Sequence, residues 1–98
     1  MPDATLVVRN PSGLHARPAA TFVKAAAGFR SDVSVTNLTR DPDKAAAARS
    51  LLSILGLGVS CGHEIRIAAE GEDAEEALTT LRGLVEAGLG EPVDDPRP

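Results

Sequence analysis

Residues 13–20 read Gly13-Leu14-His15-Ala16-Arg17-Pro18-Ala19-Ala20 and connect a predicted strand to a predicted helix. The apolar run within Thr5 to Arg9 favours a strand, and four turn-forming residues follow it. Pro18 lacks an N–H, so a helix accepts it only in the first turn, where that N–H would have no partner. We therefore predict a helix from about Ala16 to Ala27, with His15 at or near its N-cap.

This predicted helix start carries basic side chains where acidic or hydroxyl side chains are usual. His15 and Arg17 lie there, and no acidic residue occurs between Asp3 and Asp32. The backbone N–H groups of Ala16 and Arg17, together with the guanidinium, suit a phosphate group. The same positive field favours the neutral imidazole, which can accept a phosphoryl group covalently. The alternative is that His15 is an ordinary surface residue.

The motif from Gly13 to Ala19 resembles the active-site signature of the HPr family, the histidine phosphocarriers of the bacterial phosphoenolpyruvate-dependent sugar phosphotransferase system. The resemblance covers roughly residues 4 to 88 and is poor between Leu38 and Ala48. It implies that His15 takes a phosphoryl group, on Nδ1, from phosphorylated Enzyme I and passes it to sugar-specific IIA domains. Arg17 would balance the phosphate charge. Such a carrier has no turnover of its own, so it is not an enzyme, and it needs no cofactor.

Alternation of polar and apolar residues predicts strands over Asp32–Thr36 and Glu64–Ala69. Between them, the resemblance implies a short strand around Lys44–Ala48, although the alanines also favour a helix from Ala46 onward. The order β-α-β-β-α-β-α favours an α+β fold, in which helices cover one face of an antiparallel sheet. The HPr family has this fold as an open-faced β-sandwich, with four strands in the order 1-4-2-3 and three helices on one face.

The helices have recognisable ends. Gly28 is predicted as the C′ residue of the first helix. A second, short helix begins after Ser50, which is a good N-cap residue, and ends at Gly56 or Gly58.

The third helix is predicted to begin at the capping-box sequence Asp73-Ala74-Glu75-Glu76 and to close at Gly88. Its predicted apolar stripe comprises Ala74, Ala77, Leu78, Leu81, Leu84 and Val85.

Ser50 has two interpretations that do not exclude each other. As an N-cap, its hydroxyl bonds an otherwise unpaired N–H. The resemblance aligns it with the regulatory serine of the family, which implies phosphorylation by a serine kinase. A phosphate there would add a charge of about −2 at a helix start next to Arg49.

A short helix cannot bury leucines on every side, so some leucines after Ser50 are predicted to face water, while Ile54 is predicted to be core. Together with residues near His15 they form a candidate partner-binding surface, the docking patch, and the family docks its partners through the corresponding surface. The predicted docking patch comprises Leu14, Ala20, Lys24, Ala27, Leu51, Leu52 and Leu55.

The chain has 98 residues, enough for one domain with a modest core. We predict that residues 1–90 form this domain and that the acidic, proline-rich residues 91–98 form a flexible tail. The single cysteine, Cys61, excludes an internal disulfide and fits a reducing cytoplasm. We interpret Cys61 as a packing or incidental residue and His63 as a solvated turn residue.

Composition excludes several classes of protein. The net charge of −4 and the absence of Trp and Tyr disfavour binding to nucleic acid. One Cys and two His are too few for a zinc cluster, so no metal site is predicted. The longest uncharged stretch, Ser50 to Gly62, is shorter than the roughly 20 residues of a membrane span, so no membrane insertion is expected. We expect a cytoplasmic monomer.

Other functions remain open. The chain could be an HPr-like carrier of a nitrogen-related or dihydroxyacetone kinase phosphorelay, which neighbouring genes would reveal. It could also be a regulatory binding module that acts through Ser50 and the leucines, although the presence of His15 argues against that. A hydrolase is the weakest alternative, because the sequence has no nucleophile–base–acid set.

Overall fold

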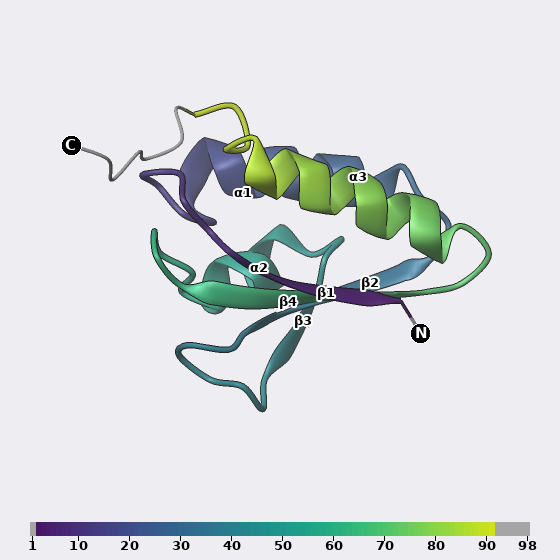
Figure 1. Cartoon of the computed structure of the whole chain (residues 1–98), viewed down its shortest axis with the longest axis horizontal. Coiled ribbons are helices and arrows are strands. Elements are labelled where there is room, and N and C mark those ends of the chain that lie inside the picture. The colour runs from purple at the N-terminus through teal and green to yellow at the C-terminus, as the bar shows by residue number, and fades with distance from the viewer. Residues whose placement is uncertain (1, 92–98) are drawn as a thin grey trace.

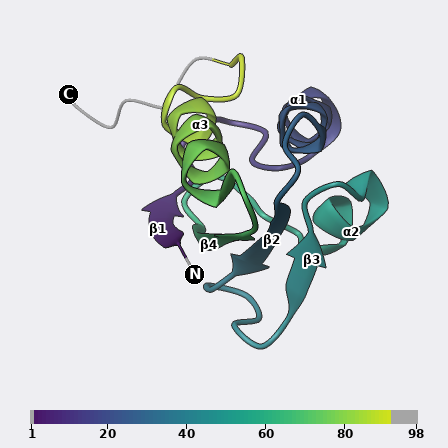
Figure 2. The same cartoon turned by 90° about the vertical axis from the view of Figure 1, so that its right-hand side faces the viewer.

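The computed structural model describes residues 2–91. It is a four-stranded antiparallel sheet with three helices on one face (Figure 1, Figure 2). The strand order is β1-β4-β2-β3, which confirms the predicted α+β fold. In chain order the elements are β1 (Asp3–Val7), α1 (Ala16–Ala27), β2 (Asp32–Asn37), β3 (Ala45–Ala47), α2 (Leu51–Gly56), β4 (Glu64–Glu70) and α3 (Ala74–Glu86).

The two central strands, β2 and β4, follow the alternation in the sequence. Val33 and Val35 are buried under the helices, whereas Ser34 and Thr36 are half-buried on the other face of the sheet. Val35 pairs with Ile67 of β4, and both side chains are fully buried. Because one face is covered by helices and the other is open, alternate positions have different environments, and this fixes the register.

The first strand begins and ends earlier than the predicted Thr5 to Arg9. Its ladder with β4 runs from Asp3 to Val7. Val8 bonds instead to the turn before β4: its N–H donates to the His63 carbonyl at 2.9 Å, and its carbonyl accepts from Gly62 N–H at 2.7 Å. The chain therefore leaves the sheet at Val8 and enters the loop that leads to α1.

The short strand β3 forms where the resemblance implied it, and the competing helix from Ala46 does not form. Ala46 pairs with Val35 and is buried, so the tertiary contact with β2 overrides the helical propensity of the alanines. The turn before β3 is organised by Asn37, whose side-chain oxygen accepts from the N–H groups of Thr39 and Arg40, both at 3.2 Å.

The core lies between the helices and the sheet. Phe22 of α1 is its largest fully buried side chain, and Ile54 of α2 is also fully buried, as predicted. The predicted stripe of α3 is confirmed, since Ala74, Ala77, Leu81 and Val85 are buried and Leu78 and Leu84 pack partly against the core.

Within residues 2–91 no helix is both long enough and apolar enough to cross a membrane.

The ends of α1 and α3 differ from each other. Gly28 has φ −77°, so α1 ends in a tightened right-handed turn and not in the predicted left-handed C′ residue. Gly88 has φ +92° and does close α3 in the left-handed conformation, as predicted.

The predicted capping box of α3 does not form. Asp73 is the N-cap, but its carboxylate makes no capping bond and reaches across to the turn between α1 and β2. There it accepts from the N–H groups of Arg30 and Ser31, both at 2.9 Å, and from the Ser31 hydroxyl. These two amides would otherwise lack partners in a tight turn, so the carboxylate joins two distant segments. We call this contact the Asp73 latch.

Candidate functional site

His15 is the N-cap of α1, as predicted. Its backbone is extended, with φ −128° and ψ 162°, and its carbonyl accepts from Ala19 N–H at 3.4 Å. The half-buried imidazole makes no capping hydrogen bond, and the first turn of α1 contains no acidic residue. The side chain that normally satisfies a helix start is therefore replaced by a ring that leaves the start open.

The residues before His15 hold it in place. Gly13 has φ +58°, and a Cβ there would collide with the Val59 carbonyl, so only glycine allows this approach. Leu14 N–H donates to the same carbonyl at 3.0 Å. The Leu14 side chain is completely buried in the core, which corrects its assignment to the docking patch. It anchors the loop instead of meeting a partner.

The helix start offers two open backbone amides. Pro18 has no N–H, and Ala19 N–H bonds the His15 carbonyl, so the free donors of the first turn are Ala16 and Arg17. Among residues 2–91, neither amide donates to any group. Ala16 has φ +50°, a left-handed conformation that costs a non-glycine residue about 1 kcal/mol. Such strain is typical of functional sites.

A carboxylate from the other end of the chain reaches the same loop. Glu91 accepts from Asn10 Nδ2 at 3.0 Å, from Ser12 N–H at 3.0 Å and from Ser12 Oγ at 2.8 Å. The hydrogen bond from Asn10 and then those from Ser12 lower the pKa of the Glu91 carboxyl, and the nearby Arg17 guanidinium adds a smaller effect in the same direction. Glu91 is therefore part of the folded domain, which corrects its assignment to the tail. Residues 92–98 lie outside the described residues.

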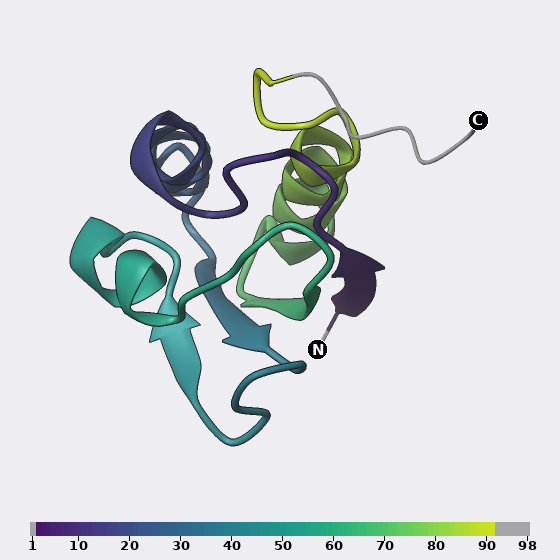
Figure 3. The ribbon, with the colours of Figure 1, turned by 90° about the vertical axis from the view of Figure 1, so that its left-hand side faces the viewer.

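The docking patch, without Leu14, lies on two neighbouring helices. Figure 2 and Figure 3 show α1 and α2 side by side on the helical face of the sheet. Leu51 and Leu52 are 41% and 82% exposed, which confirms that some leucines of α2 face water, and Leu55 is half-buried. On α1 the exposed members are Ala20, Lys24 and Ala27, spaced so that they share one side of the helix.

A family model described as the PTS HPr component phosphorylation site matches residues 3–87. The chain belongs to the PTS-HPr family. It is 46% identical over 79 residues to phosphocarrier protein HPr of Streptomyces coelicolor, covering 81% of this chain and 82% of that protein. It is 41% identical over 83 residues to HPr of Haloferax volcanii, covering 85% of this chain and 91% of that protein.

Longer relatives and solved structures agree with this family. The chain is 48% identical over 89 residues to the multiphosphoryl transfer protein of Salmonella typhimurium, covering 91% of this chain but only 23% of that protein. The chain thus spans less than a quarter of the length of that relative. A crystal structure of HPr from Thermoanaerobacter tengcongensis matches with a TM-score of 0.87 and 41% identity, covering 95% of this chain and all of that one.

In this HPr-family chain, Ser50 caps α2 as predicted. Its Oγ accepts from Ser53 N–H at 3.2 Å. The neighbouring Arg49 guanidinium, which the sequence suggested as a partner for a phosphoserine, donates to the Phe29 carbonyl. The structural role of Ser50 is thus confirmed, and its phosphorylation stays a prediction.

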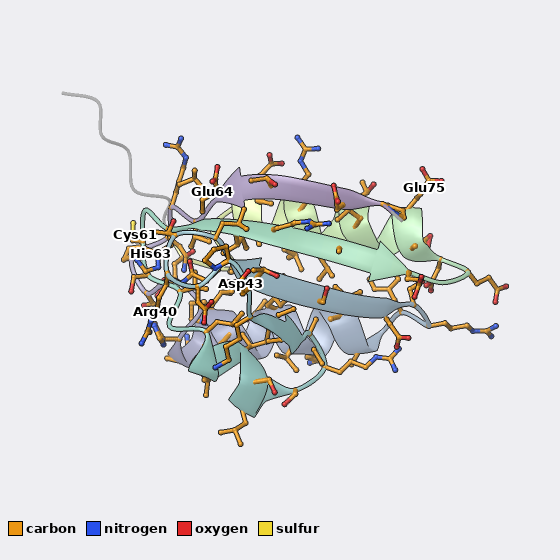
Figure 4. The ribbon with its side chains drawn as sticks, turned by 90° about the horizontal axis from the view of Figure 1, so that it is seen from below. Arg40, Asp43, Cys61, His63, Glu64 and Glu75 are labelled. Carbon is orange, nitrogen blue, oxygen red and sulfur yellow. The ribbon has the colours of Figure 1, made fainter. Side chains whose placement is uncertain are left out.

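Figure 4 shows Arg40, Cys61 and His63 together at one end of the sheet. His63 is not a freely solvated residue, because its Nδ1 lies 3.1 Å from Ser60 N–H and 3.0 Å from Asn37 Nδ2. Nδ1 therefore accepts both of these hydrogen bonds. Cys61 is exposed, so it is not a packing residue.

Within residues 2–91, no three His, Cys, Asp or Glu side chains group closely enough to hold a metal ion. Sequence reasoning identified His15, Arg17 and the two amides but missed Asn10, Ser12 and Glu91. The turn glycines at Gly88 and Gly90 were the available signal, since they indicate that the chain reverses after α3.

Proposed function

We propose that this chain is a phosphocarrier that accepts a phosphoryl group on His15 from phosphorylated Enzyme I and passes it to IIA components for sugar uptake. The observation that carries the proposal is the open start of α1, where a histidine N-cap lies beside two amides that donate to no group among residues 2–91. A helix N-terminus of this kind stabilises an anion, and family membership indicates which anion arrives.

The transfer needs only chemistry that His15 can perform. The lone pair of Nδ1 attacks the phosphorus of the phosphorylated donor, a new P–N bond forms, and the bond between phosphorus and the donor side chain breaks with its electron pair returning to that side chain. His15 keeps its proton on Nε2. Passing the group to an acceptor protein repeats the same exchange in the opposite direction.

Nδ1 is the better acceptor atom for this geometry. It is the ring nitrogen nearer to the backbone, which favours contact between a phosphoryl group on Nδ1 and the amides of Ala16 and Arg17. The Arg17 side chain is exposed and can turn onto two phosphate oxygens. The protein therefore binds and orients the group, and the high transfer potential comes from the P–N bond itself.

The docking patch supplies the meeting surface for both donor and acceptor. Leu51 and Leu52 are exposed on α2, and a small apolar area beside the phosphate site suits brief contacts. One face must meet two proteins in turn, so each complex has to be small and short-lived.

The experiment that tests the proposal is incubation with Enzyme I and phosphoenolpyruvate, comparing wild type with His15→Ala. We expect one added phosphate that is acid-labile, base-stable and absent from His15→Ala. Wild type that stays unmodified, with a donor that charges an authentic HPr, would reject Enzyme I as its donor. A nitrogen-related or dihydroxyacetone kinase relay would then be tested with its own donor.

A further inference from the structure

Glu91 contacts the loop that leads to His15 with both of its carboxylate oxygens. Oε1 accepts from Asn10 Nδ2 and from Ser12 N–H, both at 3.0 Å, and Oε2 accepts from Ser12 Oγ at 2.8 Å. These partners lie 79 and 81 residues away in the sequence. We call this contact the Glu91 latch.

The segment after α3 turns back and places Glu91 against this loop. Gly88, Leu89 and Gly90 all have positive φ, at 92°, 53° and 89°, which reverses the chain at the end of the helix. Leu89 is only 1% exposed, and its N–H donates to the Leu84 carbonyl at 2.9 Å. Figure 3 shows this segment lying against the loop between β1 and α1. A left-handed non-glycine residue is costly, so the reversal is held by its contacts.

Within the loop, Asn10 links Glu91 to Gly13, which lies two residues before His15. Its side chain is fully buried, and Nδ2 also donates to the Gly13 carbonyl at 2.9 Å, while Gly13 N–H donates back to the Asn10 carbonyl at 3.1 Å. Asn10 Oδ1 has no hydrogen-bond partner among residues 2–91. A carboxylate only accepts hydrogen bonds, so Glu91 fixes the orientation in which Asn10 presents its amide nitrogen to Gly13.

We infer that Glu91 is a positioning residue for the phosphoryl-acceptor site, acting through Asn10 and Ser12 on the loop that sets the His15 ring and the amides of Ala16 and Arg17. This inference rests on the proposed function. Glu91 does not touch the His15 ring. Its effect follows from alignment, because an acceptor nitrogen must be in line with the donor bond and small displacements cost large factors in rate.

The test compares Glu91→Ala, Glu91→Gln and Asp73→Ala in phosphorylation by Enzyme I and phosphoenolpyruvate. Glu91→Ala is expected to lower kcat about tenfold while the KM for this protein stays unchanged, because the docking patch is intact. Glu91→Gln keeps an acceptor oxygen for Asn10 and should recover most of the rate. Asp73→Ala is the matched control: it removes an equally hydrogen-bonded carboxylate at the other end of α1, a helix about 18 Å long, and should leave kcat unchanged.

Amide hydrogen exchange tests the effect of Glu91 on the loop independently of phosphoryl transfer. Amide hydrogen exchange at Ser12 and Gly13 should accelerate in Glu91→Ala and not in Asp73→Ala. Wild-type rates in Glu91→Ala, unchanged exchange at Ser12 and Gly13, or an equal loss of kcat in Asp73→Ala would each overturn the positioning role. If wild type itself is not phosphorylated, the proposed function fails, and the exchange result alone decides whether Glu91 holds the loop.

Discussion

The first backbone N–H groups of a helix have no partner inside the helix, and α1 and α2 differ in how these groups are treated. At α2 the hydroxyl of Ser50 accepts from Ser53 N–H at 3.2 Å, so the helix satisfies its own start. At α1 the N-cap is His15, which makes no capping bond, and the amides of Ala16 and Arg17 stay open. A cap is worth about 1 kcal/mol, so α1 gives up stability that α2 keeps. The difference supports the proposal that the start of α1 binds a phosphoryl group.

The open start persists because its surroundings hold it. Leu14 is buried in the core, Gly13 packs on the Val59 carbonyl, and Glu91 binds the loop through Asn10 and Ser12. These contacts fix the geometry of a helix start that lacks internal stabilisation. The same geometry is the one that electrostatic stabilisation of a phosphoryl group would use.

Giving α1 an acidic cap should erase the difference between the two helix starts. His15→Asp supplies a side chain that can accept from Arg17 N–H, since Pro18 offers none. We expect complete loss of phosphorylation, with the free energy of unfolding raised by about 1 kcal/mol. Urea denaturation together with the phosphorylation assay checks both effects. A variant that is less stable than wild type would show that the start of α1 is already satisfied.

Removing the guanidinium from the open start should have the next largest effect. A charge-assisted hydrogen bond contributes about 2 kcal/mol, so Arg17→Ala is expected to slow phosphoryl transfer about thirtyfold without changing the melting temperature. Lys44→Ala is the control, because it removes an exposed cation that lies outside the docking patch. If Arg17→Ala keeps the wild-type rate and Lys24→Ala slows transfer, then Lys24 holds the phosphate.

Removing the N-cap of α2 should lower the stability of the fold without affecting phosphoryl transfer. Ser50→Ala removes the bond to Ser53 N–H and is expected to lower the free energy of unfolding by about 1 kcal/mol. The rate of phosphorylation at His15 should not change. Ser53→Ala keeps the backbone N–H and the cap, so it serves as the control in the same denaturation experiment. Equal stability of Ser50→Ala and wild type would contradict the capping role.

Lowering the pH should weaken the Glu91 latch and the Asp73 latch, which lie at the two ends of α1. The Ser50 cap of α2 should not change. Hydrogen bonds from Ser31 and Arg30 lower the pKa of Asp73, and those from Asn10 and Ser12 lower the pKa of Glu91, from ordinary values of 3.8 and 4.5. Both latches therefore stabilise the fold above these ordinary values, and the stabilisation is lost as the pH falls through the lower folded pKa values. Ser50 does not titrate.

The measurement is the melting temperature as a function of pH between about 2 and 6. The double variant Glu91→Gln with Asp73→Asn should show a flatter acid decline than wild type. An identical decline in both proteins would mean that other carboxylates cause the acid sensitivity.

Most of the fold was predictable because its signals are local. Periodicity gave β2, β4 and the buried stripe of α3, and Pro18 placed the start of α1 at the correct residue. The capping box failed because Asp73 bonds Arg30 and Ser31, a contact between segments far apart in sequence. A local pattern cannot show such a competitor.

In the candidate site, too, residues of a local motif were predictable, whereas residues placed by long-range contacts were not. His15 and Arg17 belong to one continuous motif, so the sequence alone was enough to propose them. Leu14 was misassigned because an apolar residue beside a site can face inward or outward, and only packing decides which. Glu91 was misassigned because composition favoured a tail, whereas Leu89 and its positive φ turn the chain back onto the loop.

The most direct test of the open start is the NMR spectrum of the protein before and after phosphorylation. We expect a phosphorus–nitrogen coupling to His15 Nδ1 and large downfield shifts of the Ala16 and Arg17 amide protons. The Leu52 and Ser53 amides at the start of α2 should stay in place. Phosphorylation on Nε2, or unchanged Ala16 and Arg17 amides in the phosphorylated protein, would contradict the assignment of this helix start as the phosphate site.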